Sequence, residues 1–85
     1  MSEINELLND IKTKKHLFGH RETLKNIDKV ERIYIASNCP EEIMKKIKER
    51  AKKAEVKVKL LNLKTYELKE LCKKPFPISV ISVLK

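Results

Sequence analysis

The sequence predicts an α/β fold in which a β-sheet carries helices on both of its faces. Segments rich in β-branched residues alternate with segments of helical periodicity that are ten or so residues long. The chain has 85 residues, of which 41% are hydrophobic, enough for one compact core. No repeat, low-complexity stretch or Gly/Ser linker divides it. We therefore expect residues 1–85 to form a single domain.

The N-terminal segment, residues 3–14, predicts an amphipathic helix. Its apolar residues recur at the helical spacing i, i+3, i+4, i+7: Ile4, Leu7, Leu8 and Ile11. Ser2 suits the N-cap position. Lysines gather at the other end of the helix, at positions 12, 14 and 15. They either complement the helix dipole or contact phosphate.

A short strand, a glycine and a second helix follow. Residues 16–18 are an apolar run that predicts a strand, and Gly19, the only glycine of the chain, ends it. The second helix is expected to reach about Ile27. The next strand, at residues 30–36, is the clearest in the sequence because it is rich in β-branched and aromatic residues.

The third helix is expected from Pro40 to about Ala54. Proline suits the first helical position, and the two glutamates that follow suit the first turn. The helix has an apolar side and a basic side, and the basic side is either a nucleic-acid surface or an ordinary solvated face. Further segments complete the pattern: a strand at 56–60, a short helix that includes residues 68–72, a loop with two prolines at 73–77, and a strand at 78–84.

The charge balance favours a polyanionic partner. Charged residues make up 38% of the chain and the formal net charge is +8. Nucleic acid is the commonest partner of so basic a domain. A membrane partner is not expected, since no apolar run approaches the length of a span and no basic helix has an aromatic apolar face. Two cysteines and a polar N-terminus unlike a signal peptide favour a reducing, cytoplasmic setting.

No catalytic or metal-binding constellation stands out. A single glycine excludes a dinucleotide fingerprint and a Walker loop, and we expect no cofactor. A zinc site would require all the histidines and cysteines to converge: His16, His20, Cys39 and Cys72. Their spacing matches no familiar zinc pattern, so we expect no metal. Cys39 precedes a helix N-terminus, which can activate a thiol, but no base is supplied, and a small residue in a turn is the favoured interpretation.

The stretch after Gly19 is the strongest candidate for a binding site. A glycine at a strand-to-helix junction allows a ligand to approach the backbone, and a helix N-terminus offers free N–H groups to an anion. Arg21, Glu22 and Lys25 follow within a turn and a half. A carboxylate would be counterproductive in a site built only for phosphates. Glu22 therefore favours a site that discriminates between bases.

Phe76 is an unusual residue for a loop. It lies between Pro75 and Pro77 and follows two lysines. The prolines keep the loop stiff, which lowers the entropy lost on docking. Its ring either points outward and stacks on an unpaired base, or folds inward and caps the core.

Three segments resemble a known family. Residues 19–25 (GHRETLK) resemble the kink-turn RNA-binding signature of ribosomal proteins of the L-thirty-e and L-seven-Ae type: a glycine, any residue, a polar or basic residue, a glutamate or similar, two spacers and a lysine. Residues 35–40 (IASNCP) look like the strand-to-helix junction of that family, and residues 68–76 (LKELCKKPF) are similar to its last helix and the following loop. The resemblance covers residues 15–84 and is closest to the L-thirty-e branch.

This resemblance implies a fold, a function and partners. The family fold is a three-layer α-β-α sandwich around a mixed four-stranded sheet. Its RNA target is a kink-turn, a sharply bent helix–bulge–helix with tandem sheared G·A pairs. We therefore expect a non-enzymatic RNA-binding protein, a ribonucleoprotein component of the large ribosomal subunit in translation. Its expected partners are structured RNA, in particular ribosomal RNA, and neighbouring ribosomal proteins.

The resemblance also assigns residues to the RNA interface. The backbone at Gly19 and His20 would lie close to the RNA. Polar side chains beyond them would read guanine edges or border the same surface, and the loop after the last helix would pack against the flipped bulge nucleotide. The expected RNA-binding residues are Gly19, His20, Arg21, Glu22, Lys25, Asn38, Lys74, Pro75 and Phe76.

Other functions are alternatives to this one. A kink-turn-binding component of a guide ribonucleoprotein or of ribonuclease P, or a stand-alone kink-turn binder, would differ only in the RNA that it binds. A small protein-interaction module would use its basic surface to meet an acidic protein. An enzyme would use Cys39.

Overall fold

The structure, a computed structural model, describes residues 3–85. The expected N-cap Ser2 lies outside the described residues, and so does the side chain of Ile4. The elements in chain order are α1 (Glu3–Thr13), β1 (His16–Phe18), α2 (His20–Lys25), the 3-10 helix η1 (Ile27–Lys29), β2 (Val30–Ile35), α3 (Glu41–Lys53), β3 (Lys57–Leu60), α4 (Thr65–Leu71) and β4 (Val80–Leu84). The expected alternation of helices and strands is confirmed.

The strands form one mixed four-stranded sheet in the order β1-β4-β2-β3. β2 and β3 are parallel, and β4 is antiparallel to both of its neighbours, β1 and β2. β4 is therefore a central strand although it is the last in the sequence. Its residues 80–83 are buried, in keeping with a run of β-branched side chains that is covered on both faces.

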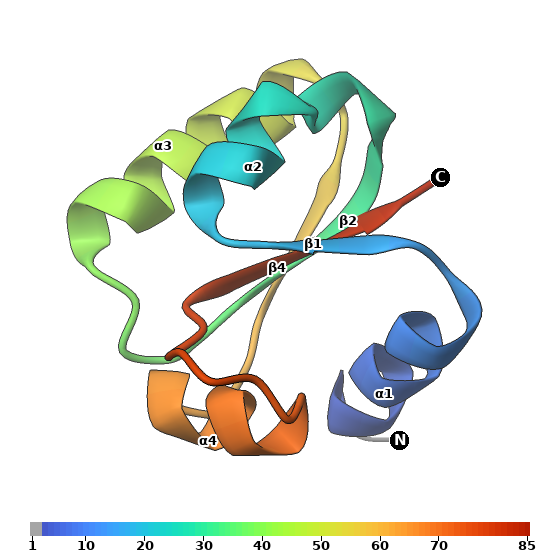
Figure 1. Ribbon diagram of the computed structural model, residues 1–85. Coiled ribbons are helices and arrows are strands. Elements are labelled where there is room, and N and C mark those ends of the chain that lie inside the picture. Colours follow the sequence, from blue (N-terminus) through green and yellow to red (C-terminus); the bar gives the residue numbers. More distant parts are fainter. Residues whose placement is uncertain (1–2) are drawn as a thin grey trace.

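Helices cover both faces of the sheet (Figure 1). In this view α2 and α3 lie together above the sheet, and α1 and α4 lie below it. Each face has its own buried apolar cluster. Ile47 and Ala51 of α3 belong to the upper one, and Leu7 of α1 and Leu68 of α4 belong to the lower one. The three-layer α-β-α sandwich implied by the family resemblance is thus confirmed.

Charged and polar side chains also join α1 to the sheet. Asp10 is only 4% exposed, and its Oδ2 accepts hydrogen bonds from Arg32 Nη1 (2.6 Å) and from the Tyr34 hydroxyl (2.7 Å). Arg32 also pairs with Glu6 (2.7 Å), which accepts a further bond from Lys59. Burial raises the pKa of Tyr34 to about 12, so its hydroxyl remains a donor. We call these five residues the α1 charge cluster.

The second helix is shorter than expected. It ends at Lys25 rather than near Ile27, and η1 follows. Asn26 leaves the helical region with φ −115° and ψ 25°, and its side-chain amide donates to the Glu22 carbonyl oxygen (3.0 Å). That local bond competes with continuation of the helix, as is typical of asparagine.

Two other boundaries differ from the sequence-based expectation. Pro40 has an extended ψ of 137° and is the N-cap of α3, so the first helical residue is Glu41. The last strand begins at Val80 rather than at Ile78. The Ile78 N–H donates to the Thr65 carbonyl oxygen (3.3 Å) at the start of α4, which draws this residue away from the sheet ladder.

Candidate nucleic-acid interface

One edge of the sheet brings together the segments that the sequence singled out. β1 and β2 end at this edge and β4 begins there, because β4 runs antiparallel to both. The Gly19 N–H donates to the Val80 carbonyl oxygen (2.8 Å), and the Ala36 N–H donates to the Ser79 carbonyl oxygen (2.8 Å). We call this surface the junction edge; it consists of residues 19–25, 36–40 and 73–79.

The backbone at Gly19 requires glycine. Its φ of 94° and ψ of 151° lie in a region that is open in practice to glycine alone. A Cβ atom at this position would meet no heavy atom within 4 Å, so backbone conformation rather than crowding imposes the choice. The carbonyl oxygen of Gly19 accepts bonds from the N–H (3.2 Å) and the hydroxyl (2.9 Å) of buried Thr23, which fix the turn into α2. The space in front of Gly19 is free for a ligand.

The exposed side of α2 carries the polar residues of the sequence signature. Arg21, Glu22 and Lys25 are exposed, and His20 is half-buried. Residues three and four apart are neighbours on a helix, so Lys25 lies beside both Arg21 and Glu22. Within residues 3–85, none of these three side chains belongs to an ion pair. Two cations and a carboxylate are therefore available to an external partner.

Asn38 connects two of the segments at the junction edge. Its Oδ1 accepts a hydrogen bond from the Thr65 N–H (2.9 Å), and its Nδ2 donates to the Thr65 hydroxyl (3.4 Å). Thr65 is the first residue of α4. Asn38 thus borders the expected surface and also satisfies a free N–H at the start of α4. The sequence pattern indicated the first property but not the second.

The loop after α4 turns back toward the sheet. Lys73 has a left-handed φ of 54°, and the Lys74 N–H donates to the Lys69 carbonyl oxygen (3.0 Å), an arrangement that ends a helix. Lys74 is half-buried, whereas Pro75 and Phe76 are exposed. The turn at Lys73 therefore directs the basic, proline-containing loop to the junction edge.

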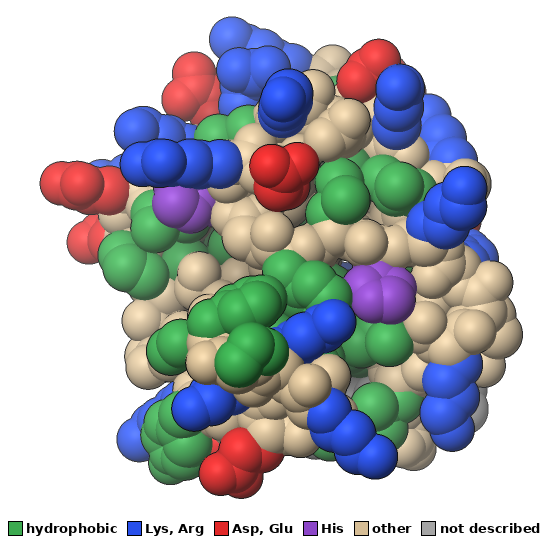
Figure 2. Space-filling model, in the orientation of Figure 1, with side chains coloured by type: hydrophobic (Ala, Val, Ile, Leu, Met, Phe, Trp, Pro, Cys, Tyr) green, Lys and Arg blue, Asp and Glu red, His purple; other side chains and the backbone are tan. Residues whose placement is uncertain are grey.

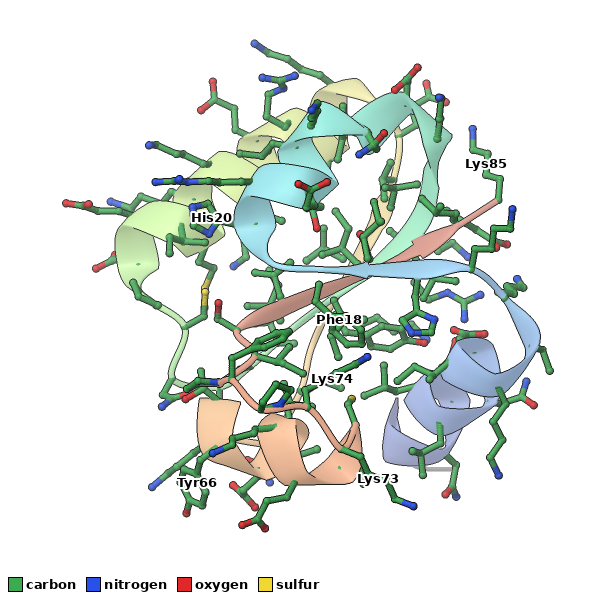
Figure 3. All side chains as sticks on the ribbon, viewed as in Figure 1. Phe18, His20, Tyr66, Lys73, Lys74 and Lys85 are labelled. Atoms are coloured by element: carbon green, nitrogen blue, oxygen red, sulfur yellow. The ribbon has the colours of Figure 1, made fainter. Side chains whose placement is uncertain are left out.

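Phe18, the last residue of β1, lies beside the junction edge and is a residue that the sequence did not single out. Its ring is half-buried and lies edge to face against Phe76, with centroids 6.4 Å apart. The Lys74 Nζ lies 4.9 Å from the centroid of the Phe18 ring, and Figure 3 shows the two side chains together in the middle of the molecule. Phe76 itself is 44% exposed, so it rests on Phe18 with nearly half of its surface in solvent. In the sequence, only its position directly before Gly19 indicated that Phe18 lies near the candidate site.

The basic side of α3 is a second exposed charged surface. Figure 2 shows lysine and arginine side chains over α2 and α3, and apolar side chains gathered lower down, over the chain between α4 and β4. Two lysines of α3 pair within the helix, Lys45 with Glu41 (3.7 Å) and Lys53 with Glu49 (3.9 Å). Lys48 and Lys52 are exposed. α3 packs against α2, which belongs to the junction edge, through the apolar side opposite to these lysines.

The cysteines are poorly placed for nucleophilic chemistry. Cys39 is 7% exposed, and burial raises the pKa of both the Cys39 and the Cys72 thiol. A raised pKa keeps a thiol protonated and unreactive.

Among residues 3–85, no group of three or more His, Cys, Asp and Glu side chains is placed to hold a metal ion. No helix in the described part of the chain is long and apolar enough to cross a membrane.

Comparison with known proteins gives one family. The model of the ribosomal protein L7Ae/L30e/S12e/Gadd45 family matches residues 2–85. The chain is 33% identical over 86 residues to the large ribosomal subunit protein eL30 of Archaeoglobus fulgidus, a match that covers 98% of this chain and 95% of that protein. It is 37% identical over 82 residues to eL30 of Sulfurisphaera tokodaii, covering 94% and 77% of the two chains.

Solved structures share the fold. A 15.5 kD RNA-binding protein of Giardia lamblia superposes with a TM-score of 0.80 at 26% identity, over 100% of this chain and 77% of that one. A protein of unknown function from Bacillus halodurans superposes with a TM-score of 0.82 at 18% identity, over 100% and 87% of the two chains. The second match is a likeness of fold alone.

Proposed function

Because the chain belongs to the ribosomal protein L7Ae/L30e/S12e/Gadd45 family, we propose that it is an RNA-binding component of the large ribosomal subunit that recognises and stabilises a kink-turn. Two relatives over nearly the whole chain are large-subunit proteins, and a structural neighbour is an RNA-binding protein. The observation that carries the proposal is the junction edge, where an open glycine backbone, unpaired polar side chains on α2 and a half-exposed phenylalanine converge.

In this proposal α2 reads the tandem G·A pairs. The backbone at Gly19 and His20 approaches the RNA, which requires the open space in front of Gly19. Arg21 and Lys25 donate hydrogen bonds to the O6 and N7 acceptors of guanine, and the Glu22 carboxylate accepts from exocyclic amines. The carboxylate gives discrimination, because a site of cations alone would bind any phosphate backbone.

The loop after α4 holds the extruded bulge nucleotide. The exposed ring of Phe76 packs against the base, and Pro75 keeps the loop close to its bound conformation, which lowers the entropy cost of docking. Lys74 supplies a cation over the neighbouring Phe18 ring. Asn38 borders the same surface and holds the start of α4, which sets the position of the loop.

A change in the RNA tests this function most directly. A titration with a kink-turn RNA is compared with a titration in which both G·A pairs are replaced by G·C pairs. Polar contacts to base edges contribute roughly 1–3 kcal/mol each, so the replacement should weaken binding by at least about tenfold. Equal affinity for the two RNAs would leave only general polyanion binding and would refute the proposal.

The same proposal has consequences for catalytic activity and for cellular location. A protein of this kind has no catalytic activity of its own, and the raised pKa of the Cys39 thiol supports this. It works in the cytoplasm, on the ribosome. A guide ribonucleoprotein or ribonuclease P is the alternative that uses the same surface. Purification of the protein with its bound RNA, followed by sequencing of that RNA, separates these cases.

A further inference from the structure

A row of rings continues beyond the junction edge along β1. His16 and Phe18 are two residues apart on this strand, so their side chains share one face of the sheet. The rings of His16 and Phe18 meet edge to face with centroids 5.0 Å apart, and Phe18 meets Phe76 in the same way at 6.4 Å. We call His16, Phe18, Lys74 and Phe76 the β1 strip. It extends from the junction edge to the opposite end of the strand.

The far end of the β1 strip opens into a basic cleft. The cleft has a volume of about 490 Å³ and lies at the turn from α1 to β1; its lining residues are Lys12, Thr13, Lys14, Lys15, His16, Leu17 and Leu84. Lys14 is paired with Glu31 (2.6 Å), whereas Lys12 and Lys15 are exposed and belong to no ion pair among the described residues. Two cations are therefore available where the row of rings ends.

We propose that the β1 strip and this cleft bind a short unpaired segment of the same RNA, contiguous with the extruded bulge nucleotide. His16 and Phe76 supply ring faces for bases, Phe18 spaces them, and Lys12 and Lys15 neutralise phosphates at the far end. The proposal rests on kink-turn binding at the junction edge. It adds a preference for kink-turns whose bulge is longer than the minimum.

The chemistry of the surface favours RNA over an acidic protein. Proteins that hold single-stranded nucleic acid combine aromatic rings for stacking with a positively charged track for the backbone. The β1 strip has both, in one line: three rings, a lysine over the central ring, and free lysines at the end. β1 is an edge strand with only three residues, so it offers little backbone for pairing with another protein strand.

The test measures the coupling between bulge length and side chains of the β1 strip. Binding constants are determined for a minimal kink-turn RNA and for one whose bulge carries about four additional unpaired uridines, with the wild-type protein and with His16→Ala and Lys15→Gln. For each protein, the binding constant for the longer RNA is divided by that for the minimal RNA. The coupling is this ratio for the wild type divided by the ratio for the variant, and any effect of the longer bulge on the RNA alone cancels in it. We expect a coupling of about tenfold for His16→Ala, the loss of one stacked base.

Matched substitutions elsewhere serve as controls. Tyr66 is an aromatic residue that is 55% exposed and projects from α4 away from β1 (Figure 3), and Lys52 is an exposed lysine on α3. Tyr66→Ala and Lys52→Gln should show no coupling to bulge length. For Lys15→Gln, the salt dependence of binding to the longer RNA should also fall by about 0.7 in log–log slope.

The outcomes separate this proposal from the function on which it rests. If both strip variants bind the minimal RNA normally and show a coupling of one, which means no coupling, the proposed RNA binding by the β1 strip is refuted. Kink-turn binding at the junction edge would remain in place. Loss of discrimination on the minimal RNA by the wild type would overturn both. Coupling in the strip variants and none in the controls is the result that supports the proposal.

Discussion

Two groups of charged side chains in this protein are held in opposite ways. In the α1 charge cluster, Glu6 and Asp10 each contact Arg32, and the pairs lie between a helix and the sheet. At the junction edge, Glu22 is exposed beside Arg21 and forms no ion pair with any described residue. A carboxylate that is paired within the fold positions a helix, whereas one that the fold leaves in solvent is available to a ligand.

The substitution Asp10→Ala should have the largest effect. It removes the acceptor of both Arg32 and the buried Tyr34 hydroxyl, which should lower the free energy of unfolding by about 3 kcal/mol. Urea denaturation followed by circular dichroism measures this change. Asp28→Ala, at an exposed position on η1, should cost less than about 0.5 kcal/mol. If the free energy of unfolding falls equally in the two variants, the α1 charge cluster does not stabilise the packing of α1 on the sheet.

The substitution Glu22→Ala should act on binding and not on folding. The free energy of unfolding should change by less than about 0.5 kcal/mol, because the side chain is exposed. Discrimination between G·A and G·C forms of the kink-turn should fall by roughly 1–3 kcal/mol, although the protein becomes more basic. Calorimetric titrations of both RNAs give this difference, with the exposed Glu42→Ala on α3 as control. A variant as selective as the wild type would contradict the role of Glu22.

The pH dependence of stability should reveal the paired carboxylates. The hydrogen bond from Lys59 lowers the pKa of Glu6 in the folded protein below its ordinary value. A group with a lowered folded-state pKa contributes stability that is present above its unfolded pKa and lost as the pH falls through the folded pKa. The free energy of unfolding should therefore decline below about pH 4.3, and Glu6→Gln should make that decline shallower. Denaturation midpoints between pH 3 and pH 7 provide the measurement; parallel curves for the two proteins would exclude Glu6 as a contributor.

The smallest effect is expected on the outer side of α3. If this side meets the phosphate backbone, Lys52→Gln should weaken binding of G·A and G·C RNAs equally, and the log–log salt slope should fall by about 0.9. Binding at several salt concentrations measures that slope. An effect on one RNA and not on the other would instead make Lys52 part of the discriminating surface.

The sequence predicted the fold because its helices and strands have local causes. The β-branched run before Ala36 and the apolar spacing of α3 each specify an element without reference to the rest of the chain. The signature from Gly19 to Lys25 was also local, and α2 presents its Arg21, Glu22 and Lys25 side chains together on the exposed side. The limit of α2 was wrong because the Asn26 side chain bonds locally to the Glu22 carbonyl oxygen, and the limit of β4 was wrong because the Ile78 N–H bonds to Thr65, far away in the sequence.

The contacts that the sequence could not reveal join residues far apart in the chain. Phe18 and Phe76 meet because β4 brings the loop after α4 beside β1. Asp10 lies on the apolar side of an amphipathic helix, a position that hints at a buried partner but does not name Arg32 or Tyr34. Such pairs depend on sheet order, and no local pattern encodes sheet order.

The central place of β4 in the sheet has a consequence for folding during synthesis. β1 and β2 have no direct pairing with each other, and each acquires its antiparallel neighbour only when residues 80–84 are available. A nascent chain that has emerged only as far as α4 can form helices but lacks the centre of its sheet, so Gly19 has no carbonyl of Val80 to bond. The junction edge is therefore complete only when residues 80–84 have joined the sheet between β1 and β2.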